Sequence, residues 1–226
     1  MSVELPFPLV LATGNPDKAR EITEIFVACI DEPLVAAAIE HGGETYAFRV
    51  DRPAPIGDDL ELTTIPDVEE TGSTLEENAR IKATGLAEAL GMPAIADDTG
   101  LEVDALDGAP GVYSARYAGP DAAYADNVAK LLRELEGVYP ALRTARFATV
   151  ALARWPDGRE LVERGEVEGV IAASPAGDNG FGYDPVFVPT EGDGRTFAQM
   201  AAAEKHALSH RGRAFTALVD ALTSRR

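Results

Sequence analysis

The chain has 226 residues, 46% of them hydrophobic and 26% charged, which is typical of a folded protein with one large domain or two small lobes. A formal net charge of −18 makes the surface repel a phosphate backbone, so we expect no nucleic-acid partner. The sequence has no apolar run of membrane-spanning length and no signal-peptide pattern, and its single Cys29 suits a reducing compartment. We therefore expect a cytoplasmic protein without a membrane partner.

The N-terminal part predicts a strand followed by a helix. Residues 8–12 form a short apolar run, residues 13–16 form a turn, and apolar side chains recur at helical spacing from Asp17 onward. Asn15 suits the N-cap and Pro16 the first helical position. Residues 31–66 are rich in Pro and Gly, which predicts loops with one hairpin and a strand over residues 45–50.

The middle of the chain predicts a helix that runs to Leu90, and then a strand over residues 93–96 that ends on Asp97 and Asp98. Two pairs match the capping-box spacing at the start of this helix: Ser73 with Glu76, and Thr74 with Glu77. Further on we expect a loop over residues 108–119 and a helix over residues 121–135.

The C-terminal part predicts a hairpin and two helices. Strands over residues 146–154 and 160–167 flank a Pro-Asp-Gly turn. Thr196 and Gln199 cap a helix through Ala207, and a last helix runs to about Leu222. This element order predicts an α/β fold: a mixed sheet covered by helices, with two lobes around an active-site cleft and a single domain over residues 1–226.

The turn before the first helix is a candidate phosphate site. Unpaired N–H groups at a helix start favour an anion, and Lys18 adds a full positive charge. The alternative is an ordinary capped helix with a solvated lysine. The turn is not a P-loop, because the Gly…Gly-Lys-Ser/Thr spacing is absent.

The adjacent Asp97 and Asp98 are a candidate cation site. Two like charges at the end of an apolar strand raise each other's cost of ionisation, and a cation removes that cost. Because side chains alternate along a strand, only one of the two can be the principal ligand while the other supports it. Glu69 and Glu70 offer further oxygen ligands for Mg²⁺. The alternatives are a solvated turn for the aspartates and helix-dipole partners for the glutamates.

Two C-terminal segments carry further candidates. Phe181 and Tyr183 stand among glycines, where an aromatic ring can stack on a base or be buried in a turn. Lys205 lies near a helix end, and the His210-Arg211 pair places two donors at the following corner.

Taken together and in order, these segments resemble the inosine triphosphate pyrophosphatase family, also called Ham1-like. The matching segments span nearly the whole chain: Leu11-Ala12-Thr13-Gly14-Asn15-Pro16-Asp17-Lys18, Glu69-Glu70-Thr71-Gly72 with Glu77-Asn78-Ala79, Ala94 to Leu101, Gly108 to Tyr117, Phe181-Gly182-Tyr183-Asp184-Pro185, and Glu204-Lys205 with Ser209-His210-Arg211. Two features depart from the family pattern. Thr99 stands where the family usually has Ser, and the stretch between Lys18 and Glu70 is longer than usual.

The resemblance implies a long mixed sheet, a homodimer, and Mg²⁺-dependent hydrolysis of ITP, dITP or XTP to the monophosphate and pyrophosphate. It implies that Asp98 is the proton acceptor, with Glu70 and Asp98 as metal ligands and Glu69 as the weaker alternative to Glu70. The implied substrate-binding residues are Thr13, Gly14, Asn15, Pro16, Asp17, Lys18, Thr99, Phe181, Gly182, Tyr183, Asp184, Lys205, His210 and Arg211. Lys82 is a further candidate for substrate binding, because with Lys18 it would hold the charge that develops on the phosphate oxygens. A phosphomonoesterase and a non-catalytic nucleotide sensor remain as alternatives.

Overall fold

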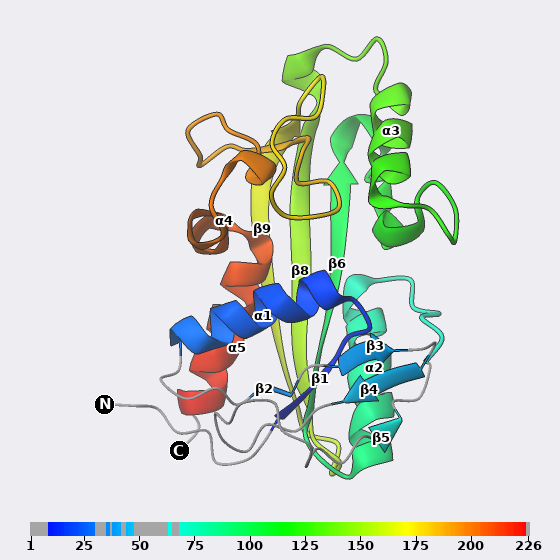
Figure 1. Ribbon diagram of the computed structural model, residues 1–226, viewed down its shortest axis with the longest axis vertical. Coiled ribbons are helices and arrows are strands. Elements are labelled where there is room, and N and C mark those ends of the chain that lie inside the picture. Colours follow the sequence, from blue (N-terminus) through cyan, green and yellow to red (C-terminus); the bar gives the residue numbers. More distant parts are fainter. Residues whose placement is uncertain are drawn as a thin grey trace. The chain divides into compact units, whose positions relative to one another are not determined.

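The computed structural model describes residues 9–29, 35–36, 38–41, 44–47, 63–64 and 68–224. The chain divides into two compact units. The first comprises Met1–Asp98, Val150–Arg164 and Ala214–Arg226, and the second comprises Thr99–Thr149 and Gly165–Arg213. Four elements continue from one unit into the other: strands β6 (Ala94–Val103), β8 (Thr144–Arg154) and β9 (Glu160–Ile171), and helix α5 (His210–Ser224) (Figure 1).

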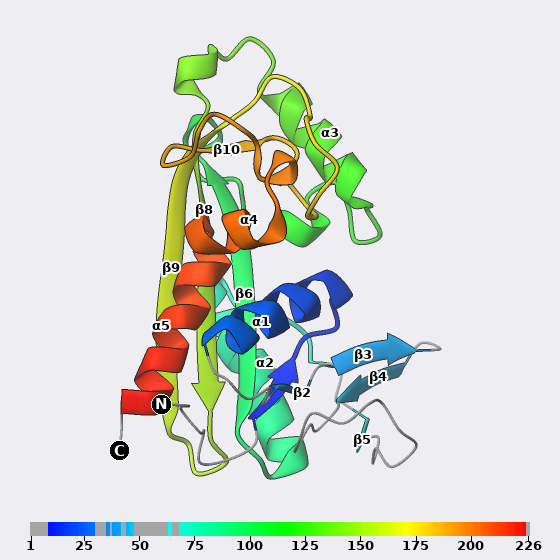
Figure 2. The same ribbon diagram turned by 60° about the vertical axis from the view of Figure 1, so that its left-hand side comes forward.

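The first unit is built around the central strand β1 (Leu9–Ala12), which pairs in parallel with β2 (Val35–Ala36) and with β6. Helices α1 (Pro16–Cys29) and α5 pack on the sheet face that presents Leu9 and Leu11, in one buried apolar cluster. Helix α2 (Leu75–Leu90) lies on the opposite side of these strands (Figures 1 and 2). The parallel strands β1, β2 and β6 of the first unit therefore have helices on both faces.

A small antiparallel sheet follows α1 in the chain. It is formed by β3 (Ala38–His41), β4 (Glu44–Ala47) and β5 (Thr63–Thr64), in the order β3-β4-β5. The β3–β4 pairing confirms the hairpin expected in this stretch. The expected strand over residues 45–50 is present as far as Ala47, and residues 48–50 lie outside the described part of the chain.

The second unit contains the remaining parts of β6, β8 and β9. It adds two short antiparallel strands: β7 (Pro110–Gly111) pairs with β6, and β10 (Phe187–Pro189) pairs with β9. Its apolar core gathers side chains from the sheet, from α3 (Tyr124–Glu134) and from the short helix η4 (Phe197–Gln199). Short 3₁₀ helices connect these elements: η1 (Asp104–Leu106), η2 (Ser114–Arg116) and η3 (Pro140–Leu142).

Among the described residues the main sheet has seven strands, in the order β10-β9-β8-β6-β1-β2, with β7 pairing with β6. Parallel and antiparallel pairs occur together, and helices flank the strands, so the predicted mixed α/β fold is confirmed. The cleft and the single-domain organisation stay predictions. No helix in the described part of the chain combines the length and the apolar character needed to cross a membrane.

Two predicted elements were wrong. The strand that carries Asp97 and Asp98 does not end there but continues to Val103, because Leu101 and Val103 are buried at alternate positions and Leu101 and Glu102 pair with β7. The single helix expected from Thr196 to Ala207 is two helices, η4 and α4 (Ala202–Leu208).

Two predicted boundaries also shift. Helix α3 begins at Tyr124 rather than near Asp121, and β9 extends beyond Val167 to Ile171.

The two start signals of α2 are resolved by its cap. The hydroxyl of Thr74 accepts from the backbone N–H of Glu77 at 3.1 Å, so Thr74 is the N-cap. The carboxylate of Glu77 reaches one residue further back and accepts from the backbone N–H of Ser73 at 2.7 Å. Both hydrogen bonds satisfy donors that a helix start leaves unpaired, which fixes where α2 begins.

Candidate active site

The turn that follows β1 is organised by the side chain of Asn15. The side-chain Oδ1 accepts from the backbone N–H groups of Asp17 at 2.9 Å and Lys18 at 3.2 Å. The backbone N–H of Asn15 donates to the hydroxyl of Thr13 at 3.2 Å. Asn15 is therefore the N-cap of α1, and Pro16 is the first helical residue, as expected. Since Asn15 engages two of the helix-start N–H groups, the main cationic group that this turn offers a phosphate is the Lys18 ammonium.

Asp97 and Asp98 meet lysines from two different helices. The ammonium of Lys18, on α1, lies 3.2 Å from Oδ2 of Asp97, whose side chain is fully buried. The ammonium of Lys82, on α2, lies 3.1 Å from Oδ1 of Asp98. Because β6 continues through both residues, their side chains point to opposite faces of the strand. Each buried carboxylate therefore has its own countercharge.

A second carboxylate reaches Lys82. Oε1 of Glu70 lies 3.3 Å from the Lys82 ammonium, so Glu70 and Asp98 converge on one nitrogen. Burial by itself lowers the pKa of Lys82, but the carboxylates of Asp98, Asp97 and Glu70 outweigh burial and raise this pKa. Lys82 is therefore charged at neutral pH. The neighbouring Glu69 is exposed, and this geometry favours Glu70 over Glu69 as a ligand.

The carboxylates around Lys82 are suitable ligands for a Mg²⁺ ion that also binds phosphate oxygens. Glu70 and Asp98 supply the hard carboxylate oxygens that Mg²⁺ prefers, and Mg²⁺ commonly binds through one or two carboxylates plus substrate phosphate oxygens. Over the residues that the structure describes, no group of three or more His, Cys, Asp or Glu side chains could hold a metal. The carboxylates of Glu70 and Asp98 are thus compatible with a magnesium ion that takes its remaining ligands from substrate phosphate oxygens and water.

Thr99 follows Asp98 directly along β6 and opens the second unit. Its hydroxyl lies 2.7 Å from the hydroxyl of Thr149 and accepts from the guanidinium of Arg211 at 3.2 Å. Arg211 is only 2% exposed. The neighbouring His210 stacks its ring on Phe147, with centroids 4.5 Å apart and planes inclined by 12°. The structure thus brings Thr99 and Arg211 together and places His210 against the apolar core.

The Phe181 loop is held by a buried ion pair. The Lys205 ammonium lies 2.6 Å from Oδ2 of Asp184, and the two side chains are 5% and 4% exposed. The same oxygen accepts from the backbone N–H of Phe181 at 2.9 Å. Gly180 has a φ of +69°, and a side chain there would overlap the Asp184 carboxylate. The geometry thus makes Asp184 the anchor of the loop that carries Phe181.

The ring of Phe181 is surrounded by cations and a second ring. The Lys205 ammonium lies 5.1 Å and the Arg211 guanidinium carbon 5.4 Å from its centroid, within cation–π range. Tyr124, at the start of α3, lies 5.7 Å away between centroids. Tyr183 instead points into the core, where its hydroxyl donates to the carbonyl of Ser114 at 2.9 Å and burial raises its pKa.

The corner between α4 and α5 places Lys205, His210 and Arg211. The hydroxyl of Ser209 accepts from the backbone N–H of Gly212 at 3.0 Å, which caps α5. A side chain at position 212 would overlap the carbonyl oxygen of His206, so only glycine fits. The backbone at this corner is therefore closely packed.

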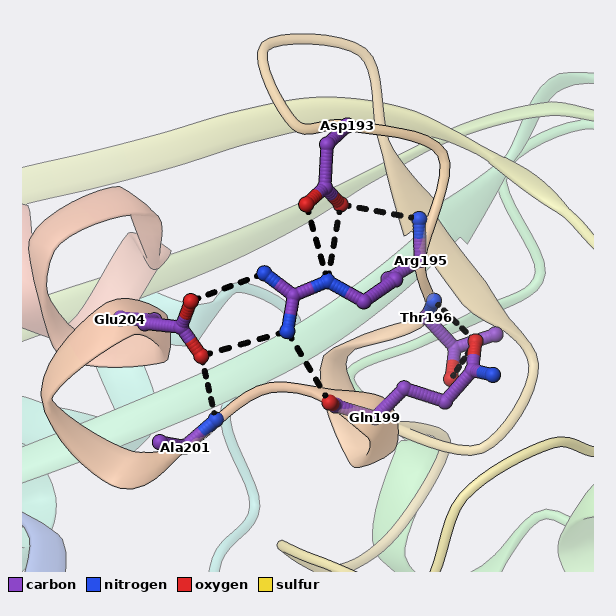
Figure 3. A network of polar contacts seen from close by, with 6 residues as sticks. All are labelled: Asp193, Arg195, Thr196, Gln199, Ala201 and Glu204. Atoms are coloured by element: carbon purple, nitrogen blue, oxygen red, sulfur yellow. Dashed lines mark hydrogen bonds and ion pairs between the residues drawn. The ribbon is translucent and has the colours of Figure 1, made fainter.

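Arg195 connects the preceding loop to the start of α4 (Figure 3). Its guanidinium donates to the carboxylate of Glu204 at 2.8 and 3.3 Å, to the carboxylate of Asp193 at 2.9 and 3.0 Å, and to the carbonyl of Gln199 at 3.3 Å. Glu204 in turn accepts from the backbone N–H of Ala201 at 2.8 Å. Because Gln199 and Ala201 are engaged in this way, η4 ends and α4 begins anew, which explains the break in the predicted helix.

Sequence reasoning missed two residues at these positions. Asn78 is fully buried and donates to Asp98, and Tyr124 lies beside Phe181. A signal for Asn78 was available, because Asn78 and Lys82 are four residues apart and share one face of α2. No sequence signal places Tyr124 near Phe181, since the two are far apart in the chain.

Comparison with known proteins identifies relatives over almost the whole chain. A dITP/XTP pyrophosphatase from Nitratidesulfovibrio vulgaris is 51% identical over 218 residues, covering 94% of this chain and 94% of that protein. A dITP/XTP pyrophosphatase from Streptomyces coelicolor is 44% identical over 214 residues, covering 93% and 94%. The solved structure of a HAM1 protein from Coxiella burnetii superposes with a TM-score of 0.75 at 37% identity, covering 96% of this chain and 99% of that one. The sequence profile of the Ham1 family matches residues 9–221, and this chain therefore belongs to the Ham1 family.

Proposed function

We propose that this protein hydrolyses the non-canonical purine nucleoside triphosphates dITP, XTP and ITP to the monophosphate and pyrophosphate. The observation that carries the proposal is the convergence of Glu70 and Asp98 on Lys82, beside the second pair of Lys18 and Asp97, in a chain whose relatives are dITP/XTP pyrophosphatases. Two lysines beside the carboxylates of Glu70 and Asp98 suit a magnesium–triphosphate complex. Such an enzyme removes deaminated purines from the nucleotide pool.

The triphosphate is bound by the turn of residues 13–18 and by two lysines. Lys18 and Lys82 carry the positive charge that offsets the charge developing on the phosphate oxygens during hydrolysis. Glu70 and Asp98 would hold Mg²⁺, which supplies charge neutralisation and makes pyrophosphate a better leaving group. Glu70 and Asp98 already lie close to one another, because both contact the Lys82 ammonium.

Asp98 orients the attacking water and accepts its proton. The water oxygen forms a bond to the α-phosphorus, the bond from that phosphorus to the bridging oxygen of the β-phosphate breaks, and pyrophosphate leaves. Lys82 and Asn78 each contact one oxygen of the Asp98 carboxylate, so the carboxylate is presented in a fixed orientation. Replacing Asp98 by Asn removes the proton acceptor. Near-normal turnover of that variant in excess Mg²⁺ would exclude this role.

The purine base is recognised by the residues of the second unit. Phe181 offers a ring for stacking, and Thr99, Lys205, His210 and Arg211, with the backbone of the Phe181–Asp184 loop, offer donors and shape. Donors aimed at the 6-keto oxygen of hypoxanthine or xanthine would be left unpaired by the 6-amino group of adenine, at a cost of about 1–3 kcal/mol each. We therefore expect a much lower kcat/KM for ATP than for ITP.

One assay tests the proposed reaction and its alternatives. ITP, XTP, dITP, ATP and GTP are incubated with the enzyme and Mg²⁺, and the products are identified. Monophosphate and pyrophosphate from ITP support the proposal, orthophosphate indicates a phosphomonoesterase, and tight binding without turnover indicates a nucleotide sensor. Equal efficiencies for ITP and ATP would contradict the proposed base selectivity.

We further propose that the enzyme is a homodimer that acts in the cytoplasm. The proposal rests on the family and on the single Cys29, whose thiol suits a reducing compartment. Light scattering coupled to size-exclusion chromatography measures the mass in solution. A mass of one chain at micromolar concentration would contradict the dimer.

A further inference from the structure

Asn78 is a fully buried amide on helix α2 that links two parts of the candidate active site. Its Oδ1 accepts from the backbone N–H of Gly72 at 2.8 Å, and its Nδ2 donates to Oδ2 of Asp98 at 3.3 Å. Gly72 lies two residues after Glu70. A single side chain thus connects the segment that carries Glu70 to the carboxylate of Asp98.

The hydrogen bond to Gly72 determines which way the amide points. A backbone N–H can only donate, so the atom of Asn78 that faces Gly72 must be the oxygen. The NH₂ group is then directed at Asp98, where it meets one carboxylate oxygen while Lys82 meets the other. Both oxygens of Asp98 therefore have a partner on α2, and those partners stand four residues apart on one face of the helix.

We infer that Asn78 is a positioning residue for the reaction, acting through Asp98 and through the segment that carries Glu70. The inference rests on the proposed function and extends it to a residue that does not touch substrate. Asn78 fixes the rotation of the Asp98 carboxylate, which leaves a defined oxygen geometry for the water and the metal. It also keeps the Glu70 segment at a set distance from Asp98, so the two ligands stay matched.

The chain offers a matched control in Asn127 on α3. Asn127 is 2% exposed, its Oδ1 accepts from the backbone N–H of Ala118 at 2.7 Å, and its Nδ2 donates to the carbonyl of Ala115 at 3.0 Å. Both residues are therefore buried helical asparagines that tie a preceding loop to their helix. The difference that the test uses is the acceptor of the NH₂ group, which is a carboxylate for Asn78 and a backbone carbonyl for Asn127.

The test compares Asn78→Ala and Asn78→Asp with Asn127→Ala and Asn127→Asp. All four variants lose the NH₂ donor, but only the aspartate variants keep an oxygen for the backbone N–H, and only the alanine variants avoid adding charge. Circular dichroism and thermal melting first establish that each variant is folded. Steady-state kinetics with ITP and Mg²⁺ then give kcat and KM separately.

We expect both Asn78 variants to lower kcat by on the order of 10–100-fold with KM for ITP changed far less, because removing a residue that orients a metal ligand has effects of this size. The Asn127 variants should lose thermal stability while keeping kcat within about threefold of the wild type, since surrounding structure rather than the reacting groups is affected. If the Asn78 variants kept kcat in the range of the Asn127 variants, the positioning role would be refuted and Asn78 would be a structural residue.

A second measurement separates this inference from the proposed function. Mn²⁺ alone is titrated into wild type, Asn78→Ala and Asn127→Ala, and binding is followed by electron paramagnetic resonance. We expect Asn78→Ala to weaken Mn²⁺ binding by on the order of 10-fold and Asn127→Ala to leave it unchanged. A wild type that hydrolyses none of the five nucleotides would refute the proposed function. In that case, equal Mn²⁺ affinity of the two alanine variants would refute the inference about Asn78.

Discussion

The buried pair of Lys205 and Asp184 allows a quantitative prediction about the Phe181 loop. Removing one partner of a buried ion pair leaves the other charge uncompensated and costs about 3–5 kcal/mol, whereas replacing both with neutral groups of similar volume is often nearly neutral. The pair fits this case, because its atoms are 2.6 Å apart and its side chains are 5% and 4% exposed. We therefore expect Lys205→Met and Asp184→Asn each to destabilise the protein by about 3–5 kcal/mol.

The double variant Lys205→Met with Asp184→Asn measures the coupling between the two charges. Asn at position 184 retains an oxygen for the backbone N–H of Phe181, so the loop anchor survives while the charge is lost. We expect the double variant to be more stable than the sum of the single effects by about 2–3 kcal/mol, the upper part of the range for contacting residues. Urea unfolding at pH 7 measures all three free energies.

Two spectroscopic probes test whether the two units unfold in one transition. The single Trp155 reports on the first unit by fluorescence, and far-ultraviolet circular dichroism reports on the whole chain. Coincident transitions would justify a two-state treatment. Single effects that add within about 0.5 kcal/mol in the double variant would show that the two charges are not coupled, and the assignment of Asp184 as an ion-paired anchor would fail.

Two further predictions concern the segments beside this pair. Gly212→Ala should destabilise the protein and raise KM for ITP, because the added methyl group overlaps the His206 carbonyl oxygen at the corner that carries Arg211. Denaturant unfolding measures the stability and steady-state kinetics measure KM. Unchanged stability would contradict the close packing at this corner. Hydrogen bonds from Arg195 lower the pKa of Glu204 from its usual 4.5 to about 2, so the stability from this contact is present above pH 4.5 and is lost as the pH falls towards 2. The melting temperature should therefore fall less steeply from pH 4.5 to pH 2 for Glu204→Gln than for the wild type. Equal slopes would exclude a contribution of the Glu204–Arg195 contact to stability.

Local signals in the sequence predicted the elements around the phosphate turn correctly. The N-cap at Asn15, the proline at the first position of α1 and the N-cap at Thr74 all depend on residues no more than three positions apart. Such patterns act through backbone groups within one turn of helix, so the sequence contains all the information they need. The hairpin turn around Gly158 was predictable for the same reason.

The extent of β6 could not be read so directly. Two adjacent aspartates and a glycine resemble the end of a strand, because buried carboxylates without partners are costly. The structure supplies partners from α1 and α2, and the strand continues to a buried Leu101 and Val103. The pairing of Lys18 with Asp97 joins residues that are distant in the chain, and no local sequence pattern predicts such a contact.

The break between η4 and α4 has a similar origin. The cap formed by Thr196 and Gln199 was correctly predicted, but helix continuation depends on what engages the next carbonyl groups. Arg195 donates to the Gln199 carbonyl, and Glu204 accepts from the Ala201 N–H, so a second helix start forms. Thr196 with Gln199, and Ala201 with Glu204, both have the spacing of a helix start. The contacts of Arg195 and Glu204 determine that two helices form instead of one.

The different partners of Asp97 and Asp98 yield a final prediction that separates their roles. Asp97 is fully buried, and its Oδ2 lies 3.2 Å from the Lys18 ammonium, whereas Asp98 contacts Lys82 and Asn78 on the other face of β6. Asp97→Asn should therefore weaken the tether of Lys18 while leaving the contacts of Lys82 and Asn78 with Asp98 in place. A hydrogen bond to a charged group is worth about 1.5–3 kcal/mol, so we expect KM for ITP to rise by about 10–100-fold.

The kinetic pattern decides which aspartate serves the chemistry. Asp98→Asn should lower kcat, because the proton acceptor is lost, while Asp97→Asn should act on KM, because a phosphate-binding lysine is less firmly held. Circular dichroism of both variants ensures that folded proteins are compared. If Asp97→Asn lowered kcat as much as Asp98→Asn and left KM unchanged, Asp97 would share or hold the catalytic role. The assignment by strand alternation and lysine pairing would then have to be reversed, since alternation itself establishes only that the two carboxylates act on different faces.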